Sequence, residues 1–358
     1  MTKSLFLKVL FIHLIAKNLV YASVSPWAFQ QIETEKAREL TRGRSLQPVT
    51  VAVVDTGIDW SHPALQSSLW TNPGEIPDNG IDDDGNGYID DVHGWNFVTN
   101  TPNLTDTEGH GTHIAGLIAG QSAEFQGVAS NAKLMILKYY DPQLSSEQNV
   151  RNSIRALQYA VQMKAQIINF SGGGPGANPE EEAVMRLADK NQILVVAATG
   201  NNSADTDLMP FFPASYGLSN ILPVTSVNPL QKLSLFANFG LSTPQIAAPG
   251  ENIKSSSRGG GFTELSGTSQ ATAIATGVAA LILGESKLKP SEVIAKILAG
   301  GRFEEALQGR TAQAMILNAA QPLKMRGPCE ALAGFRFEDS SQEEKYTVSS
   351  ENLDPSSP

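Results

Sequence analysis

The chain has a single cysteine, Cys329, among its 358 residues. One cysteine excludes an internal disulfide, so cysteine usage gives no information about the cellular compartment. Histidine is scarce too, with five in the chain, and no cluster of cysteine and histidine has the spacing of a zinc site. We therefore expect neither a zinc centre nor an organic cofactor.

Positive charge is also limited: 26 Lys and Arg stand against 36 Asp and Glu, for a net charge of −10. A chain with this balance is poorly suited to nucleic acid or to an anionic membrane surface. An uninterrupted apolar run of membrane-spanning length is missing near the N-terminus, because Lys8, His13 and Lys17 break the stretch 5–20. The composition predicts no nucleic-acid partner and no stable membrane insertion.

Residues 1–22 nevertheless have the pattern of a secretory signal. Lys3 supplies positive charge near the N-terminus, and the stretch 5–20 is largely apolar. Val20-Tyr21-Ala22 has small residues where cleavage requires them. The segment predicts a protein that is secreted or located in the cell envelope. The alternative is an uncleaved amphipathic N-terminal helix.

Beyond this segment, short apolar runs rich in β-branched residues alternate with helical patterns. Buried strands are expected at 49–55, 133–139, 167–170, 193–198, 221–227 and 245–249, and helices at 149–164, 180–190, 265–277 and 290–298. The alternation predicts an α/β fold, a doubly wound and mostly parallel sheet flanked by helices, in one domain over 48–322. We expect residues 23–47 to be an extension that packs on this domain. The Ser- and acid-rich stretch 323–358 is expected to be a largely disordered tail.

Three polar residues stand at positions that suit a reactive site. Asp55 ends the first strand, where ligands bind in open α/β sheets, although Asp-Thr-Gly also suits a simple turn. His110 lies between two glycines and is easily approached, whereas we expect His113 to be structural. Ser269 opens an alanine-rich helix, where it could be an N-cap or a nucleophile favoured by the helix dipole.

The stretch 78–91 is dense in carboxylates and glycines. Asp82, Asp84 and Asn86 lie two apart, followed by the backbone carbonyl of Tyr88 and the carboxylate of Asp90. This spacing imitates the first part of an EF-hand loop, although the closing Glu is replaced by a histidine and would need a substitute such as Asp78 or Asp91. The loop predicts a structural calcium site; a solvated acidic turn is the alternative.

Four motifs occur in a fixed order over this domain. They are Asp55-Thr56-Gly57, Gly109-His110-Gly111-Thr112-His113, Ala198-Thr199-Gly200-Asn201 and Gly267-Thr268-Ser269-Gln270-Ala271. Together they resemble the subtilisin-like serine peptidases, the subtilase family, over most of the chain from residue 27 to 320. The resemblance implies a subtilisin-like fold and a secreted serine endopeptidase that acts on proteins or peptides.

The resemblance also implies a role for each motif. Ser269 would attack the peptide carbonyl and form an acyl-enzyme, His110 would act as general base and acid, and Asp55 would orient His110. Asn201 and the Ser269 backbone N–H would form the oxyanion hole. The segments Ser171-Gly172-Gly173 and Ala198-Thr199-Gly200 would wall the S1 pocket. Because neither segment holds a carboxylate, we expect an apolar residue at the substrate position before the cleaved bond (P1).

Three features depart from the family pattern. Gln270 stands where many relatives have an oxidisable Met, which predicts tolerance to peroxide. Ala273 replaces a usual Pro, a change that a helix accepts. The stretch between Ala22 and Val49 is too short for a long N-terminal propeptide, so we expect calcium at Asp82–Asp90 to supply part of the stability.

Two other function classes remain open from the sequence. A non-catalytic subtilase scaffold that binds peptides or proteins would keep the fold without the chemistry, but the complete set of reactive residues disfavours it. A calcium-dependent surface or adhesion protein would explain the acidic loop alone and leaves the serine, histidine and aspartate motifs unexplained.

Overall fold

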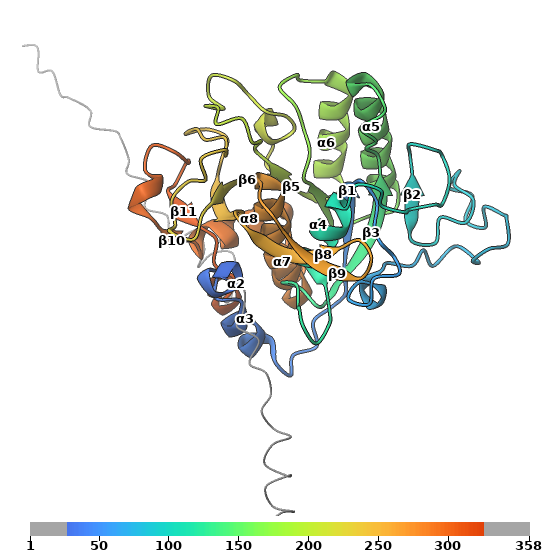
Figure 1. The fold of residues 1–358 in the computed structure, drawn as a ribbon, viewed down its shortest axis with the longest axis horizontal. Helices are drawn as coiled ribbons and strands as arrows, with labels where there is room; N and C mark the ends of the chain where they lie inside the picture. Colours follow the sequence, from blue (N-terminus) through green and yellow to red (C-terminus); the bar gives the residue numbers. More distant parts are fainter. Residues whose placement is uncertain (1–26, 326–358) are drawn as a thin grey trace, which may run out of the picture.

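Nine strands form one sheet in the order β10-β11-β7-β6-β5-β4-β1-β3-β2. The structure, a computed structural model, describes residues 27–325 (Figure 1). The strands are β1 (Val49–Asp55), β2 (Gly94–Asn96), β3 (Ala132–Lys138), β4 (Ile167–Phe170), β5 (Leu194–Ala198), β6 (Ile221–Val227), β7 (Ile246–Pro249), β10 (Arg302–Phe303) and β11 (Met315–Ile316). All neighbouring pairs in this sheet are parallel except β10 and β11. The predicted mostly parallel α/β sheet is confirmed.

The strands are apolar on both faces because helices cover the sheet on both sides. In β1, Val51 and Val53 pack into one hydrophobic core, whereas Ala52 and Val54 pack into a second one. The first core also contains apolar residues of α4 (His110–Ala119), α7 (Thr268–Glu285) and α8 (Pro290–Ala299). The second contains those of α5 (Ser146–Gln162) and α6 (Pro179–Lys190). Figure 1 shows the sheet between these two helical layers.

Local signals explain where the outer helices begin. Ser145 caps α5 through a reciprocal pair of hydrogen bonds with Gln148, and Asn178 caps α6 with Pro179 at its first position. Short 3-10 turns lie at Gln66–Ser68 (η1), Ala214–Tyr216 (η2) and Glu305–Leu307 (η3).

Helix α7 is the central helix of the fold. Every residue of it is buried except Leu283 and Glu285. Small side chains let such a helix pack closely against the sheet, and α7 contacts strands β4, β5, β6 and β7. Its first turn is thereby fixed relative to the ends of those strands.

Residues before the sheet pack against residues near the end of the described chain. Helices α2 (Trp27–Gln31) and α3 (Thr34–Thr41) add Ala28 and Phe29, among others, to the first core. The Ala319 N–H donates to the Ile32 carbonyl at 2.7 Å. The boundary predicted at residue 323 falls inside α9 (Gln321–Lys324), whose Leu323 is buried, and is therefore too early. The predicted signal at 1–22 and the tail from 326 onward lie outside the described residues.

A two-stranded antiparallel hairpin, β8 (Ile253–Ser257) and β9 (Gly261–Leu265), was not predicted from the sequence. It lies outside the main sheet and leads directly into α7. Within residues 27–325 no single helix is both long and apolar enough to cross a membrane; α7 and α8 meet the two criteria only together, across a bend of 113°.

Candidate active site

The sequence motifs meet at the carboxyl edge of the parallel sheet. Asp55 ends β1, Ser171 follows β4 and Asn201 follows β5, and these three strands are neighbours in the order β5-β4-β1. The N-terminal turns of α4 and α7 bring His110 and Ser269 to the same edge, where open α/β sheets bind ligands.

Asp55 and His110 form a direct pair. The Asp55 carboxylate accepts from His110 Nδ1 at 2.8 Å and from the Thr56 N–H at 2.7 Å. Asp55 is buried, whereas about a third of the His110 side chain (33%) is exposed. Burial alone would lower the pKa of His110, but the charge and hydrogen bond of Asp55 outweigh it, so the pKa lies above its ordinary value. Since Nδ1 is engaged by Asp55, Nε2 is the nitrogen left for proton transfer.

Helix α4 begins at His110 itself, directly after its N-cap Gly109. Its second residue, Gly111, lies so close to β1 that a Cβ atom there would be 2.2 Å from the Gly57 carbonyl oxygen. Only glycine permits this approach, which sets the imidazole beside Asp55.

Asp106 holds the chain before His110 and was missed by the sequence analysis. Its carboxylate, 3% exposed, accepts from the N–H groups of Gly109 and Thr112 at 2.8 and 2.9 Å, and also from the hydroxyls of Thr112 and Thr56. Burial opposes its charge, but these hydrogen bonds lower the pKa of Asp106 below its ordinary value. An aspartate four residues before the histidine, at the start of a helix, was the signal that could have revealed it.

Ser269 is the second residue of α7, and Gly267 is the N-cap. The Ser269 hydroxyl donates to the Ser171 carbonyl oxygen at 2.9 Å and does not cap a backbone N–H. The capping interpretation of Ser269 is therefore wrong. As in any α-helix, the first backbone N–H groups of α7 have no partner one turn earlier in the helix; the Thr268 N–H donates instead to the Asn201 side chain at 2.9 Å.

Asn201 is fixed by its neighbour in the serine motif. Its side-chain oxygen accepts from the Thr268 N–H at 2.9 Å and from the Thr268 hydroxyl at 3.0 Å. A backbone N–H can only donate, so the amide oxygen faces Thr268 and the amide NH₂ faces away from it. Asn201 is exposed, which leaves that NH₂ free to donate to a bound group.

The two segments expected to contact substrate are both attached to the first turn of α7. The Ser171 hydroxyl donates to the Ser269 carbonyl at 3.1 Å, and the Gly200 N–H donates to the Thr268 hydroxyl at 3.3 Å. Thr199 and Ala198 are buried behind them, whereas Gly172 is partly exposed. The segments 171–173 and 198–200 thus flank Ser269 on two sides.

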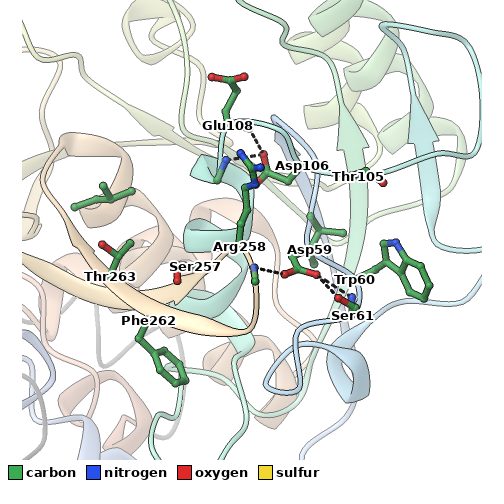
Figure 2. A pocket seen from close by; sticks show the side chains of 14 residues that line it. Asp59, Trp60, Ser61, Thr105, Asp106, Glu108, Ser257, Arg258, Phe262 and Thr263 are labelled. Carbon is green, nitrogen blue, oxygen red and sulfur yellow. Dashed lines mark hydrogen bonds between the residues drawn. The ribbon is translucent and has the colours of Figure 1, made fainter.

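A cavity of about 910 Å³ lies beside His110, between the loop 59–61 and the β8–β9 hairpin (Figure 2). The Gly259 N–H donates to Asp59 at 2.8 Å, and the Arg258 guanidinium donates to the Thr107 carbonyl. Trp60 stands at its side with 59% of its surface exposed. Asp106 and Gly109, which precede His110, line this cavity, whereas Asp55, His110 and Ser269 do not.

His113 plays the structural part expected of it. It is fully buried in α4, and its Nε2 lies 2.9 Å from the Ile253 carbonyl oxygen. Burial lowers its pKa to about 4, which keeps it neutral.

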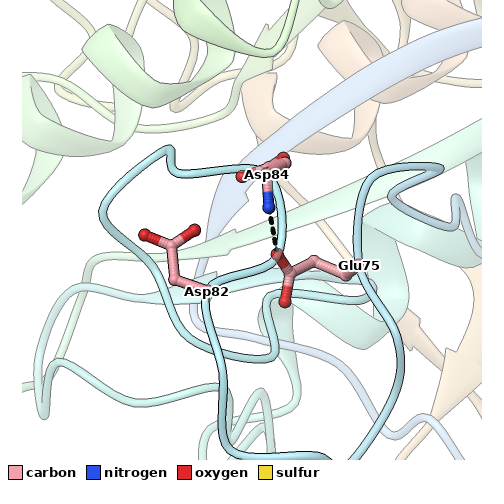
Figure 3. A group of neighbouring side chains, drawn as sticks. All are labelled: Glu75, Asp82 and Asp84. Atoms are coloured by element: carbon pink, nitrogen blue, oxygen red, sulfur yellow. Dashed lines mark hydrogen bonds between the residues drawn. The ribbon is translucent and has the colours of Figure 1, made fainter.

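The acidic loop is arranged differently from the sequence expectation. Carboxylate oxygens of Glu75, Asp82 and Asp84 lie within 4.8 Å of one another (Figure 3). Asp90 instead accepts the N–H groups of Asn79 and Gly80, at 3.1 and 3.0 Å. The sequence analysis missed Glu75, which lies outside the EF-hand-like spacing.

Asn86, another expected ligand, is hydrogen-bonded within the loop. The Asn86 side-chain oxygen accepts the Tyr88 N–H at 2.8 Å, and its NH₂ donates to Asp84 and Asp91. Oxygen ligands of this kind suit calcium, and Glu75, Asp82 and Asp84 are the group that could hold it.

Comparison with known proteins agrees with this geometry. The profile of the subtilase family matches residues 47–342. The major intracellular serine protease of Bacillus subtilis is 34% identical over 278 residues, covering 75% of this chain and 80% of that protein. Subtilisin-like protease 1 of Plasmodium berghei is 29% identical over 72% of this chain, which spans only 46% of that longer protein. A crystal structure of a cold-adapted subtilisin-like serine proteinase superposes with a TM-score of 0.64 at 25% identity, covering 82% of this chain and 98% of that one. The chain therefore belongs to the subtilase family of serine endopeptidases.

Proposed function

We propose that this chain cleaves peptide bonds through an acyl-enzyme on Ser269. The observation that carries the proposal is the Asp55–His110 hydrogen bond of 2.8 Å beside a serine at the start of α7. A serine hydroxyl is a weak nucleophile until a base takes its proton. His110, held by Asp55 through Nδ1, is the base positioned for that step.

In the first half of the reaction, the Ser269 hydroxyl leaves the Ser171 carbonyl and gives its proton to Nε2 of His110. Its oxygen attacks the peptide carbonyl carbon, and the protonated His110 then donates that proton to the leaving amine. In the second half, His110 takes a proton from water, which attacks the ester carbonyl; His110 then gives that proton to the leaving Ser269 oxygen, which releases the acid and restores the hydroxyl. Asp55 stabilises the imidazolium in both halves.

The oxyanion of each tetrahedral intermediate needs donors that are already in place. The Asn201 NH₂ supplies one, because Thr268 fixes the opposite end of that amide. The free N–H of Ser269 at the helix start supplies another. The dipole of α7 adds favourable potential for the developing negative charge.

The proposal is tested by peptide hydrolysis with purified protein and its Ser269→Ala variant. Release of new peptide N-termini from an unfolded protein substrate, lost in the variant, is the expected result. A folded wild-type chain that binds such substrates without cleaving them would favour the non-catalytic scaffold instead.

We expect the same site to prefer substrates with an apolar P1 side chain. Neither flanking segment, 171–173 or 198–200, contains a charged residue, so an Arg or Lys side chain would lose its hydration without gaining a partner. Peptides that differ only at P1 test this expectation, and fastest cleavage after Arg or Lys would contradict it.

We also propose that Glu75, Asp82 and Asp84 bind a structural calcium ion. Three converging carboxylates repel one another, and a divalent cation would offset that repulsion. A ligand that binds only the folded state raises the melting temperature. The expected result is a higher melting temperature with added calcium, and a smaller rise in Glu75→Gln. Glu124→Gln, the same substitution at an exposed glutamate outside this loop, is the matched control. An identical melting temperature in calcium and in EDTA would refute the site.

We propose further that residues 1–22 direct export and are then removed. The relative from Bacillus subtilis is named an intracellular protease, so the location of this chain needs its own test. Expression in a bacterial host should give protein outside the cytoplasm whose N-terminus lies near residue 23. Protein retained in the cytoplasm with residues 1–22 attached would contradict export.

A further inference from the structure

We propose that the Phe211 ring closes the pocket between the two segments flanking Ser269 and restricts P1 to small side chains. The inference rests on the proposed function, because P1 must lie beside the nucleophile. It adds a size limit to the apolar preference, set by a residue that lies in neither flanking segment.

The ring lies between two glycines, one from each segment. A Cβ atom on Gly173 would be 2.6 Å from Phe211 Cε1, and one on Gly200 would be 2.9 Å from Phe211 Cδ2. These two carbons belong to opposite edges of the ring. The ring therefore spans the gap between the segments 171–173 and 198–200, and any side chain at either glycine would collide with it.

Both segments are held close to the nucleophile. Ser171, two residues before Gly173, accepts the Ser269 hydroxyl at 2.9 Å. Gly200 is hydrogen-bonded to Thr268, the residue before Ser269. We expect a P1 side chain of a peptide bound at Ser269 to enter between these segments, where it would meet Phe211, which is half-buried.

The backbone around Phe211 keeps the ring in place. The Phe211 N–H donates to the Ser215 hydroxyl at 3.1 Å, and the Ser215 N–H donates back to the Phe211 carbonyl at 3.0 Å. Phe212 and Gly174 exchange two backbone hydrogen bonds, at 2.7 and 3.0 Å, which tie this loop to the segment after Gly173. Close-packed interiors resist displacement of a ring held in this way, so a large P1 side chain gains no room.

The experiment uses peptides identical except for Ala, Leu or Phe at P1, with the wild type, Phe211→Ala and Phe303→Ala. Phe303, on the edge strand β10 and 53% exposed, is the matched aromatic control. One extra or missing methylene group in an apolar pocket changes kcat/KM by about 10–200-fold. We expect wild type and Phe303→Ala to favour Ala over Phe by at least about tenfold. In Phe211→Ala the order should reverse.

Wild type that cleaves fastest after Phe would overturn the inference, and so would an unchanged order in folded Phe211→Ala. The wild-type panel is decisive even if the variant does not fold. Labelling of Ser269 by a fluorophosphonate separates this inference from the proposed function. A labelled, active enzyme with the wrong P1 order refutes the role of Phe211 alone, whereas an unlabelled, inactive enzyme refutes the catalytic assignment on which that role depends.

Discussion

The hydroxyl of Ser269 donates to the carbonyl oxygen of Ser171 at 2.9 Å. The nucleophile thus lies against a segment that flanks the substrate position, and it must rotate away to give its proton to His110. Catalytic hydrogen bonds commonly tighten only when substrate is bound, so this arrangement suits a resting enzyme whose Asp55–His110 pair is already formed.

Replacing Asp55 by Asn should remove most activity while leaving the fold intact. The amide can donate to Nδ1, which would put the imidazole proton on Nε2 and prevent it from acting as a base. By analogy with serine proteases in general, kcat should fall about 10⁴-fold. Steady-state kinetics and circular dichroism would check this, and an active Asp55→Asn enzyme would contradict the assigned pair.

The acid limb of the pH profile should reflect His110. Its pKa lies above the ordinary value of 6.5 because of Asp55, and only the neutral imidazole accepts a proton. Activity should therefore fall with a midpoint above 6.5 as the pH decreases, and an acid limb centred well below this value would contradict the Asp55–His110 coupling.

The Asp55–His110 pair also contributes to the free energy of unfolding, and this contribution changes with pH in the direction opposite to activity. Its contribution is fully present below the unfolded-state pKa of His110 and is lost as the pH rises through the folded-state pKa. Urea unfolding of wild type and His110→Ala across this range measures the difference. A difference in the free energy of unfolding between wild type and His110→Ala that grew with rising pH would contradict this prediction.

Asn201→Asp should lower kcat by about 10²–10³-fold, a magnitude taken from a subtilisin, a relative of this chain. The new carboxylate can still accept from Thr268 but cannot donate to the oxyanion. KM should change little, since the charge develops only after binding. A change confined to KM would show that Asn201 binds substrate without stabilising the oxyanion.

Asp106→Asn should destabilise the fold as well as slow the reaction. The amide NH₂ would face N–H groups or hydroxyls that now donate to the carboxylate. The lost hydrogen bonds should lower the free energy of unfolding by about 1–3 kcal/mol. Because the pKa of Asp106 is lowered in the folded state, its contribution is present above the ordinary value of 3.8 and is lost as the pH falls through the folded-state pKa. Urea unfolding at neutral pH checks the loss, and an unchanged midpoint would contradict the role given to Asp106.

Gln270 should make the enzyme tolerant to peroxide. The side chain lies next to the nucleophile and is buried, and it has no sulfur to oxidise. The matched variant Gln270→Met should lose activity on peroxide treatment while wild type retains it. Equal inactivation of both would place the sensitive group elsewhere.

Features encoded by contiguous residues were predictable. The apolar run 49–55 and the similar runs after it predicted the parallel sheet, because buried strands need apolar residues on both faces. The site around Asp55, His110 and Ser269 could be predicted because the parallel strands end, and the helices begin, at the same edge of the sheet.

Features that depend on contacts between distant segments were not predictable. Glu75 joins Asp82 and Asp84 only through the path of the loop, and the ring of Phe211 reaches Gly173 and Gly200 only in the folded chain. Neither contact leaves a periodic or spaced pattern in the sequence. Asp106 is intermediate: its hydrogen bonds from Gly109 and Thr112 are local, but the one from the Thr56 hydroxyl depends on the fold.

The central claim is that Ser269 is activated by His110. Treatment of wild type, Ser269→Ala and His110→Ala with a fluorophosphonate probe, followed by mapping of the label by mass spectrometry, tests it most directly. We expect one label, on Ser269 of the wild type, and none on either folded variant. A folded, calcium-loaded wild type that remains unlabelled, or a label that persists in Ser269→Ala, would contradict it.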